Sequence, residues 1–91
     1  MFAVIARVTI DPSRGDEAVG ILHQAVVPTA KAATGFSSGT WTRSVDGTTG
    51  WSIEIFDTEE NARAYAATAD VPPGAPVTID SVDVLEVLAT A

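Results

Sequence analysis

Three polar or aromatic side chains in this 91-residue sequence have the chemistry to hold a flat small molecule. Tyr65 and Trp51 each combine an aromatic ring with a polar tip, and Asn61 both donates and accepts hydrogen bonds. With Leu22 they would form an apolar pocket with few polar groups, which is typical of a ligand site. The simpler alternative is that the two rings fill a core and that Asn61 satisfies backbone groups at the start of a helix.

The single histidine and the lack of cysteine narrow the chemistry further. His23 lies about 120° from the centre of the apolar stripe of a predicted helix, so we expect an exposed side chain that does not serve as a general base. Without cysteine the chain has no disulfide, no thiolate nucleophile and few routes to a structural zinc site. We expect no metal site and no cofactor.

Composition points to a small acidic protein with a surplus of apolar residues. Twelve acidic and five basic residues give a net charge of −7, which disfavours nucleic acid and anionic membranes as partners. The N-terminus resembles no signal peptide, and no segment approaches the length of a membrane span, so we expect a cytoplasmic protein. The 46% of apolar residues exceeds what so short a domain readily buries, which predicts a homodimer.

Hydrophobic periodicity predicts two strands and a helix on each side of a central hairpin turn. Alternation over residues 2–10 indicates a strand, and helical spacing over 16–33 indicates a helix kinked by Pro28. Asp57 and Glu60 have the spacing of a capping box before the second helix. The remaining expected elements are strands at 36–45 and 51–56 with Trp41 opposite Glu54, a helix at 58–69, a stiff loop at 70–76, and a strand at 77–88 with a bulge at Asp80–Ser81.

In this order the elements resemble the antibiotic biosynthesis monooxygenase-like family of dimeric α+β barrel proteins. The resemblance spans nearly the whole chain and rests on the opening strand, the hairpin, Val27-Pro28-Thr29 before Gly35-Phe36, and the run Phe56 to Ala62 that leads into the second helix. It implies one α+β domain over residues 1–91, with a ferredoxin-like βαββαβ order and a four-stranded antiparallel sheet in the order 4-1-3-2. It also implies a homodimer in which two sheets face each other, and a pocket between the helices and the sheet of each subunit.

The resemblance implies a reaction class but not a substrate. Members that degrade haem use a histidine in the second half of the chain and an asparagine on the first strand, whereas this chain has only His23 and carries Arg7 on that strand. Haem cleavage is therefore disfavoured. The resemblance favours a cofactor-independent monooxygenase for an aromatic or quinol-like small molecule. The alternative is a non-catalytic dimeric ligand-binding or structural module.

Oxygenases of this family use asparagine, tryptophan, tyrosine, arginine and histidine around the substrate, and four residues of this chain match those types. We therefore predict Tyr65 and Asn61 as catalytic residues and Trp51, Leu22 and Arg43 as substrate-binding residues. The pocket should lie between the helices and the sheet, with Trp51 on the same side as Tyr65. The loop at 72–76 should lie near its mouth.

Charged residues also occur on the predicted strands, and the strand order indicates which of them lie close together. In the strand order 4-1-3-2 the first and third strands are neighbours, so we expect Arg7 and Glu54 to form an ion pair. If the more apolar set of each strand faces the helices, Arg7, Trp41, Arg43 and Glu54 share the other face, as an ion-pair network or a polar ligand site. The apolar residues expected on that second face are Ala3, Ile5, Trp41, Phe56 and Leu85.

Overall fold

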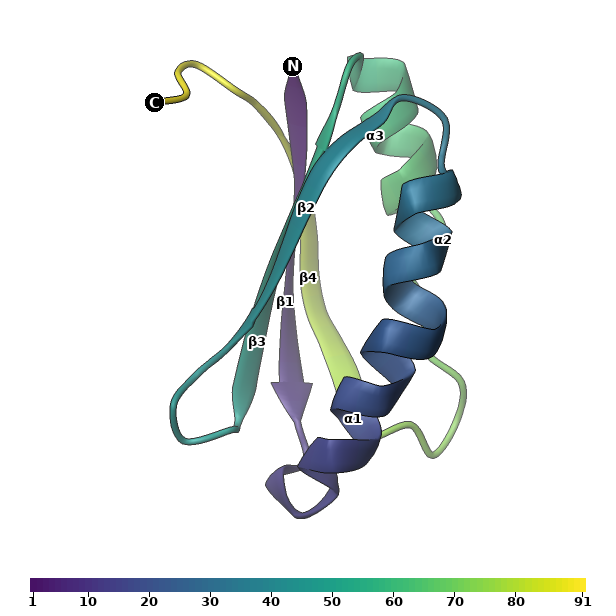
Figure 1. Cartoon of the computed structure of the whole chain (residues 1–91), viewed down its shortest axis with the longest axis vertical. Helices are drawn as coiled ribbons and strands as arrows, with labels where there is room; N and C mark the ends of the chain where they lie inside the picture. Colours follow the sequence, from purple (N-terminus) through teal and green to yellow (C-terminus); the bar gives the residue numbers. More distant parts are fainter.

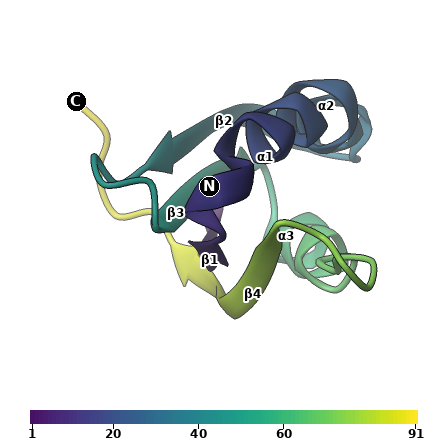
Figure 2. The same cartoon turned by 90° about the horizontal axis from the view of Figure 1, so that it is seen from below.

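The computed structural model describes all 91 residues and has a four-stranded antiparallel sheet with helices on one face (Figures 1 and 2). The sheet order is β2-β3-β1-β4, which confirms the predicted order 4-1-3-2 and the α+β, ferredoxin-like class. In chain order the elements are β1 (Phe2–Ile10), η1 (Pro12–Arg14), α1 (Gly15–Ile21), η2 (Leu22–Val26), α2 (Val27–Ala32), β2 (Phe36–Arg43), β3 (Thr49–Phe56), α3 (Glu59–Ala66) and β4 (Val77–Glu86).

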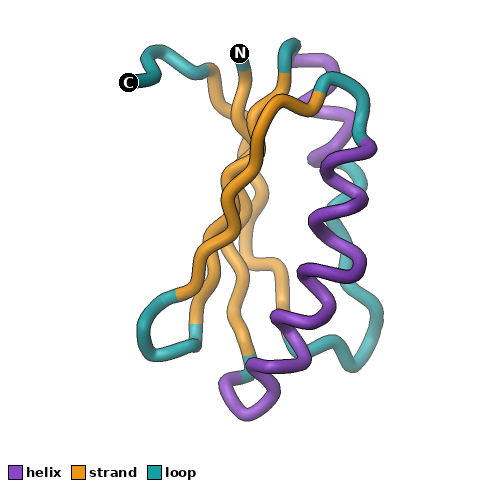
Figure 3. Tube along the Cα trace, viewed as in Figure 1, coloured by secondary structure: helices purple, strands orange, loops and turns teal.

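The first helix is continuous from α1 through η2 to α2, as the tube in Figure 3 shows, but its middle turn is a π-helix. Pro28 lacks an N–H group, and its ring would clash with the carbonyl four residues earlier in a regular α-helix. The chain resolves this conflict just before the proline, where Val27 N–H donates to the carbonyl of Leu22. The predicted kink therefore takes the form of a widened turn.

The N-cap of the second helix, α3, is one residue later than predicted, at Thr58 and not at Asp57. Thr58 is the N-cap, because its hydroxyl accepts from the backbone N–H of Asn61 at 3.1 Å. Asp57 instead accepts from Asn61 Nδ2 at 2.8 Å, and its backbone N–H donates to the carbonyl of Gly35 at 3.0 Å, which ties the helix start to the turn at Gly35. Gly35 has φ 81°, and a Cβ atom there would collide with both of these side chains, so this close approach requires glycine.

The bulge predicted at Asp80–Ser81 is confirmed. Arg7 pairs with Ser81 and Val8 with Ile79, so Asp80 is the extra residue in β4. The extra residue reverses the alternation of β4. Apolar side chains both before and after the bulge thereby face the helices.

The predicted register of the β2–β3 hairpin is wrong by two residues. Trp41 lies opposite Ser52, and Gly39 lies opposite Glu54. The connection spans residues 44–48 rather than two or four residues. Its closing geometry depends on Gly47, with φ 79°, and on a 2.7 Å hydrogen bond from Ser44 N–H to the carbonyl of Thr49.

The expected division of residues between the two sheet faces is wrong for β3 and also for β2, where Trp41 and Arg43 face the helices. Val4 pairs with Glu54 and Phe2 with Phe56, so Glu54 and Phe56 face the helices. Trp41, next to Glu54 by register, shares that face with them. The opposite face holds Arg7, Trp51, Ile53 and Ile55, together with Ala3, Ile5 and Leu85, which lie there as expected.

The expected Arg7–Glu54 ion pair is therefore absent, because the two side chains lie on opposite faces. Arg7 instead lies 3.9 Å from Asp80, and its guanidinium carbon is 5.9 Å from the centre of the Trp51 ring. The assumption that the more apolar set of β3 must face the helices fails, because Trp51, Ile53 and Ile55 form the open face of the sheet.

The hydrophobic core is small and lies under α3. Phe56, Val4 and Ala62 are at most 2% exposed, and Phe36 and Tyr65 pack their rings against Phe56. Only nine residues of the chain are buried, so much of the space under the first helix is unfilled. No helix in the structure is long and apolar enough to cross a membrane. The cytoplasmic location stays a prediction.

Candidate functional site

A cleft of about 790 Å³ separates the first helix from the sheet. Its floor is the helix-facing set of β1, and its roof is the predicted apolar stripe of the helix, which includes Leu22 and Ala25. The proline-rich loop, residues 70–76, also lines the cleft, so the loop predicted to lie near the pocket is next to it. Twenty of the 34 lining residues are hydrophobic, which is the composition expected of a small-molecule site.

The polar group that stands out in this cleft is Glu54, on the central strand β3. Its side chain lies among apolar neighbours and the residue is only 2% exposed. No basic side chain pairs with it, and Oε2 has no hydrogen-bond partner. Burial raises the pKa of Glu54 from its ordinary value of 4.5 to about 7, although the polar groups of Ser52 and Trp41 act in the opposite direction.

Trp41 supplies a second unpaired polar group beside Glu54. Its Nε1 is buried and has no hydrogen-bond partner. The indole folds back over Gly39, the residue opposite Glu54. The contact is so close that a Cβ atom at Gly39 would lie 2.6 Å from Trp41 Cη2. Glycine at this position therefore allows the ring to lie against the cleft wall next to the carboxyl group.

Tyr65 of α3 lines the same cleft. Its ring packs on Phe56 with the ring centres 5.0 Å apart. Burial, with a smaller contribution from the nearby Glu54 charge, raises the pKa of Tyr65 to about 12. The phenol therefore stays protonated at neutral pH, so it can donate a hydrogen bond to a ligand but cannot serve as a base.

Leu22 and Arg43 line the cleft together with Tyr65. The Arg43 side chain reaches from β2 to the first turn of α1. Its Nη1 atom lies so close to Gly15 that a Cβ atom there would be 3.4 Å away. The guanidinium makes no ion pair within the chain. It is therefore available to an anionic or carbonyl group of a ligand at this end of the cleft.

The other two predicted site residues do not join this group. Trp51 borders the cleft, but strand alternation directs its ring to the opposite face of the sheet, where it contacts Arg7 and is 45% exposed. Asn61 lines an adjoining hollow of about 440 Å³ between α2 and α3, which shares Tyr65 with the cleft, so Asn61 and Tyr65 meet there and not in the cleft itself. Its amide is engaged by Asp57. His23 is exposed and does not line the cleft, as expected.

Sequence reasoning missed Glu54 and Trp41 as cleft residues because it assigned both to the other sheet face. For Glu54, the signal in the sequence is a single charged residue between the apolar residues Ile53 and Ile55 of a central strand. Such a residue is seldom fully buried without a partner.

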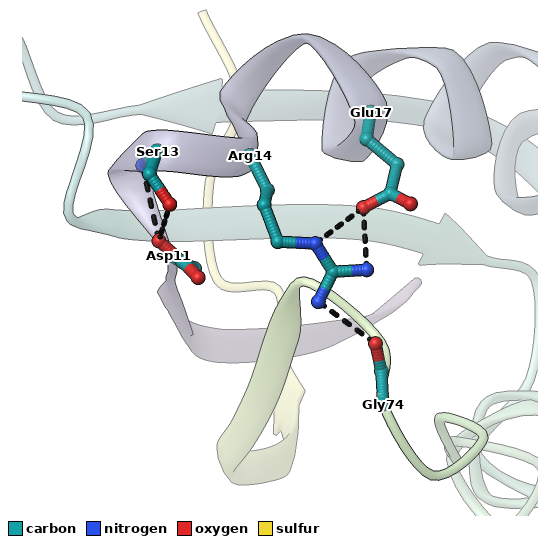
Figure 4. A network of polar contacts seen from close by, with 5 residues as sticks. All are labelled: Asp11, Ser13, Arg14, Glu17 and Gly74. Atoms are coloured by element: carbon teal, nitrogen blue, oxygen red, sulfur yellow. Dashed lines mark hydrogen bonds and ion pairs between the residues drawn. The ribbon is translucent and has the colours of Figure 1, made fainter.

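A clasp at the mouth of the cleft holds the proline-rich loop against the first helix (Figure 4). Arg14 Nη1 donates to the carbonyl of Gly74 at 2.8 Å, and Nε donates to Glu17 Oε2 at 2.6 Å. Asp11 caps the short turn before Arg14 by accepting from the backbone N–H of Ser13. The Arg14 side chain thus links the loop to the first helix, and the Asp11 N–H also donates to the carbonyl of Pro76 at 2.8 Å.

Comparisons with known proteins place this arrangement among solved structures. A search of family models finds none that matches, and no curated protein matches the chain. Among solved structures, the haem degrader MhuD of Mycobacterium tuberculosis, with two haems in its active site, has a TM-score of 0.74 at 19% identity and is matched over 100% of this chain and 99% of its own. The chain has the fold of the antibiotic biosynthesis monooxygenase-like proteins.

Two further structures support this assignment of the fold. The monooxygenase ActVA-Orf6 of Streptomyces coelicolor, in complex with nanaomycin D, matches with a TM-score of 0.66 at 16% identity, over 99% of this chain and 89% of its own. NE2512 of Nitrosomonas europaea, a protein of unknown function, matches with a TM-score of 0.68 at 20% identity, over 99% and 91% of the two chains. The resemblance predicted from the sequence is thus confirmed at the level of the fold.

Proposed function

We propose that the protein is a cofactor-independent monooxygenase that binds an aromatic or quinol-like small molecule in the cleft. The observation that carries this proposal is the large apolar cleft with a buried carboxyl group in its wall. A monooxygenase and a haem degrader share the fold, which supports the reaction class, although one fold hosts many functions.

The proposed reaction needs only the substrate, molecular oxygen and the protein. In an anthrone-type substrate, the ring CH₂ group and O₂ become a carbonyl group and one water molecule, so the substrate supplies the electrons that reduce oxygen. The protein contributes a dry apolar site, positioning by Leu22 and Arg43, and a hydrogen bond from the Tyr65 phenol to developing negative charge.

The cleft does not fit haem as the bound group. The residues that line it include no histidine, cysteine or methionine. The one phenol, Tyr65, has a pKa of about 12, which disfavours the phenolate form that would bind iron. The chain also has no cluster of three or more histidine, cysteine, aspartate or glutamate side chains that could hold a metal ion.

Two helical alanines test where the substrate binds. Ala25 lines the cleft and Ala32 lines the smaller hollow, and both are exposed. We expect Ala25→Phe to reduce oxygen uptake with 1,8-dihydroxyanthrone at least tenfold, because the added ring fills the cleft. Ala32→Phe is the matched control and should retain the wild-type rate. Wild-type oxygen uptake no faster than the uncatalysed reaction would refute the oxygenase, and an active Ala25→Phe variant would exclude the cleft.

We further propose that residues 1–91 act as one domain of a homodimer that pairs through the open face of the sheet. That face presents Trp51, Ile53 and Leu85 with 45%, 39% and 48% of their surface exposed, and no helix covers it (Figure 2). A second copy would bury these side chains. Sedimentation equilibrium should show a dimer at micromolar concentration and a monomer for Ile53→Glu. A wild-type monomer at that concentration would contradict the proposal.

A further inference from the structure

Two polar atoms of opposite character lie unpaired in the wall of the cleft. Glu54 Oε2 is an acceptor and Trp41 Nε1 is a donor, and both are buried without a hydrogen-bond partner. Such groups are rare in folded proteins, because each forfeits its bonds to water on burial. Two on neighbouring strands of the same cleft indicate a site whose hydrogen bonds are completed by a ligand.

Their geometry favours a particular ligand. Gly39 lies directly opposite Glu54, and the six-membered ring of the Trp41 indole covers Gly39. The polar end of the same indole lowers the pKa of Glu54, so the indole N–H lies close to the carboxyl group. One molecule that carries an acceptor beside a donor would satisfy both groups at once. The apolar remainder of the cleft would accommodate a flat ring system.

We infer that Glu54 and Trp41 form a recognition pair for an aromatic ketone with a neighbouring hydroxyl group, in which Glu54 accepts from the hydroxyl and Trp41 Nε1 donates to the carbonyl. The inference deepens the proposed function, because it names the substrate class of the same cleft. In turnover the ligand O–H bond breaks, its proton moves to Glu54 Oε2, and the electron pair stays on the ligand oxygen. This step needs no oxidant.

The protonation behaviour of Glu54 agrees with this role. Burial raises its pKa to about 7, so the group can both accept and release a proton near neutral pH. The other charged or titratable side chains that line the cleft are Tyr65 from α3, Arg43 from β2, Arg14 and Glu17 from the first helix and its preceding turn, and Asp70 from the proline-rich loop. Arg14 and Glu17 are paired with each other, and among these groups Tyr65 is the one whose pKa responds to Glu54.

Binding of 3-hydroxyflavone and flavone tests the pair without any turnover. The two ligands share the carbonyl and differ by the adjacent hydroxyl, and emission of 3-hydroxyflavone reports whether that hydroxyl donates to an outside acceptor. We expect the wild type to prefer 3-hydroxyflavone at least tenfold at pH 8, with a smaller preference at pH 6, where Glu54 is mostly protonated. Equal affinities for the two ligands would overturn the inference.

Variants separate the two halves of the pair. Glu54→Leu should abolish the preference for the hydroxyl, and Glu54→Gln should keep a preference that no longer changes between pH 6 and pH 8. Trp41→Phe should weaken both ligands to a similar degree, since both carry the carbonyl. Glu86→Gln, at an exposed glutamate of β4, is the matched control and should behave as wild type. A pH-dependent preference in Glu54→Gln, or any preference in Glu54→Leu, would refute the role of Glu54.

Oxygen uptake distinguishes failure of this inference from failure of the proposed function. If the hydroxyl preference holds but 1,8-dihydroxyanthrone is not oxidised, the oxygenase is refuted and the recognition pair is supported. If oxidation proceeds, Glu54→Gln should lower kcat at least 100-fold with a KM within about threefold of wild type, as loss of a general base does. An unchanged kcat would overturn the proton transfer.

Discussion

The buried carboxyl group of Glu54 predicts an unusual dependence of stability on pH. In the unfolded chain its pKa is the ordinary 4.5, and in the folded protein it is about 7. The folded state therefore binds the proton more tightly, so stability must fall as pH rises from about 4.5 to above 7. Each unit of pKa corresponds to about 1.36 kcal/mol, so the difference between 4.5 and 7 sets an upper bound of about 3–4 kcal/mol.

Urea unfolding of wild type and Glu54→Gln at pH 5 and pH 8.5, at one protein concentration, measures this cost. Glutamine keeps the size of the side chain but cannot ionise. We expect the free energy of unfolding of Glu54→Gln to exceed that of wild type by up to about 3–4 kcal/mol at pH 8.5 and by much less at pH 5. Asp11 and Asp46, whose pKa values are lowered by hydrogen bonds from neighbouring residues, contribute only below this range of pH.

An exposed glutamate provides the control for this measurement. Glu86→Gln should change stability equally at the two pH values, because no burial acts on that side chain. If wild type and Glu54→Gln differ by the same amount at pH 5 and pH 8.5, the carboxyl group is hydrated in solution. The reasoning from its burial would then be refuted.

Three further changes have expected outcomes. Gly39→Ala should cost about 1–3 kcal/mol in urea unfolding and shift tryptophan emission, because the new Cβ collides with the indole, whereas Gly20→Ala has no atom within 4 Å and should be neutral or stabilising. Arg7→Met and Glu54→Gln should have additive effects on unfolding, since the two side chains lie on opposite faces; a coupling above about 0.5 kcal/mol would contradict the observed register. Arg14→Gln should speed limited proteolysis within the proline-rich loop, and an unchanged cleavage rate would show that the clasp does not hold it.

The order of elements, the bulge and the position of the cleft could be predicted because they depend on local patterns. The apolar set of β4 changes parity at Asp80, and a change of parity is what an extra residue in a strand produces. The stripe that includes Leu22 follows helical spacing and does face the cleft. The inward position of Tyr65 can be predicted for the same reason, since it belongs to the inward stripe of α3.

The faces of β3 could not be predicted because both of its side-chain sets have a reason to be apolar. Trp51, Ile53 and Ile55 are the more apolar set, and a rule that turns such a set towards the helices places Glu54 on the wrong side. The rule assumes that a sheet has one face to bury. The rule fails where the second face is itself apolar, and it then assigns every candidate site residue on the strand to the wrong face of the sheet.

The bulge at Asp80 also bears on self-association by way of the sheet edge. β4 is an edge strand, and such strands expose backbone N–H and C=O groups to which the strand of another molecule can add. The bulge interrupts this row, and the carboxylates of Asp80, Asp83 and Glu86 on the same strand would repel a like strand. The molecule is thereby protected against edge-to-edge aggregation into extended sheets, even though the broad side of its own sheet is apolar and open.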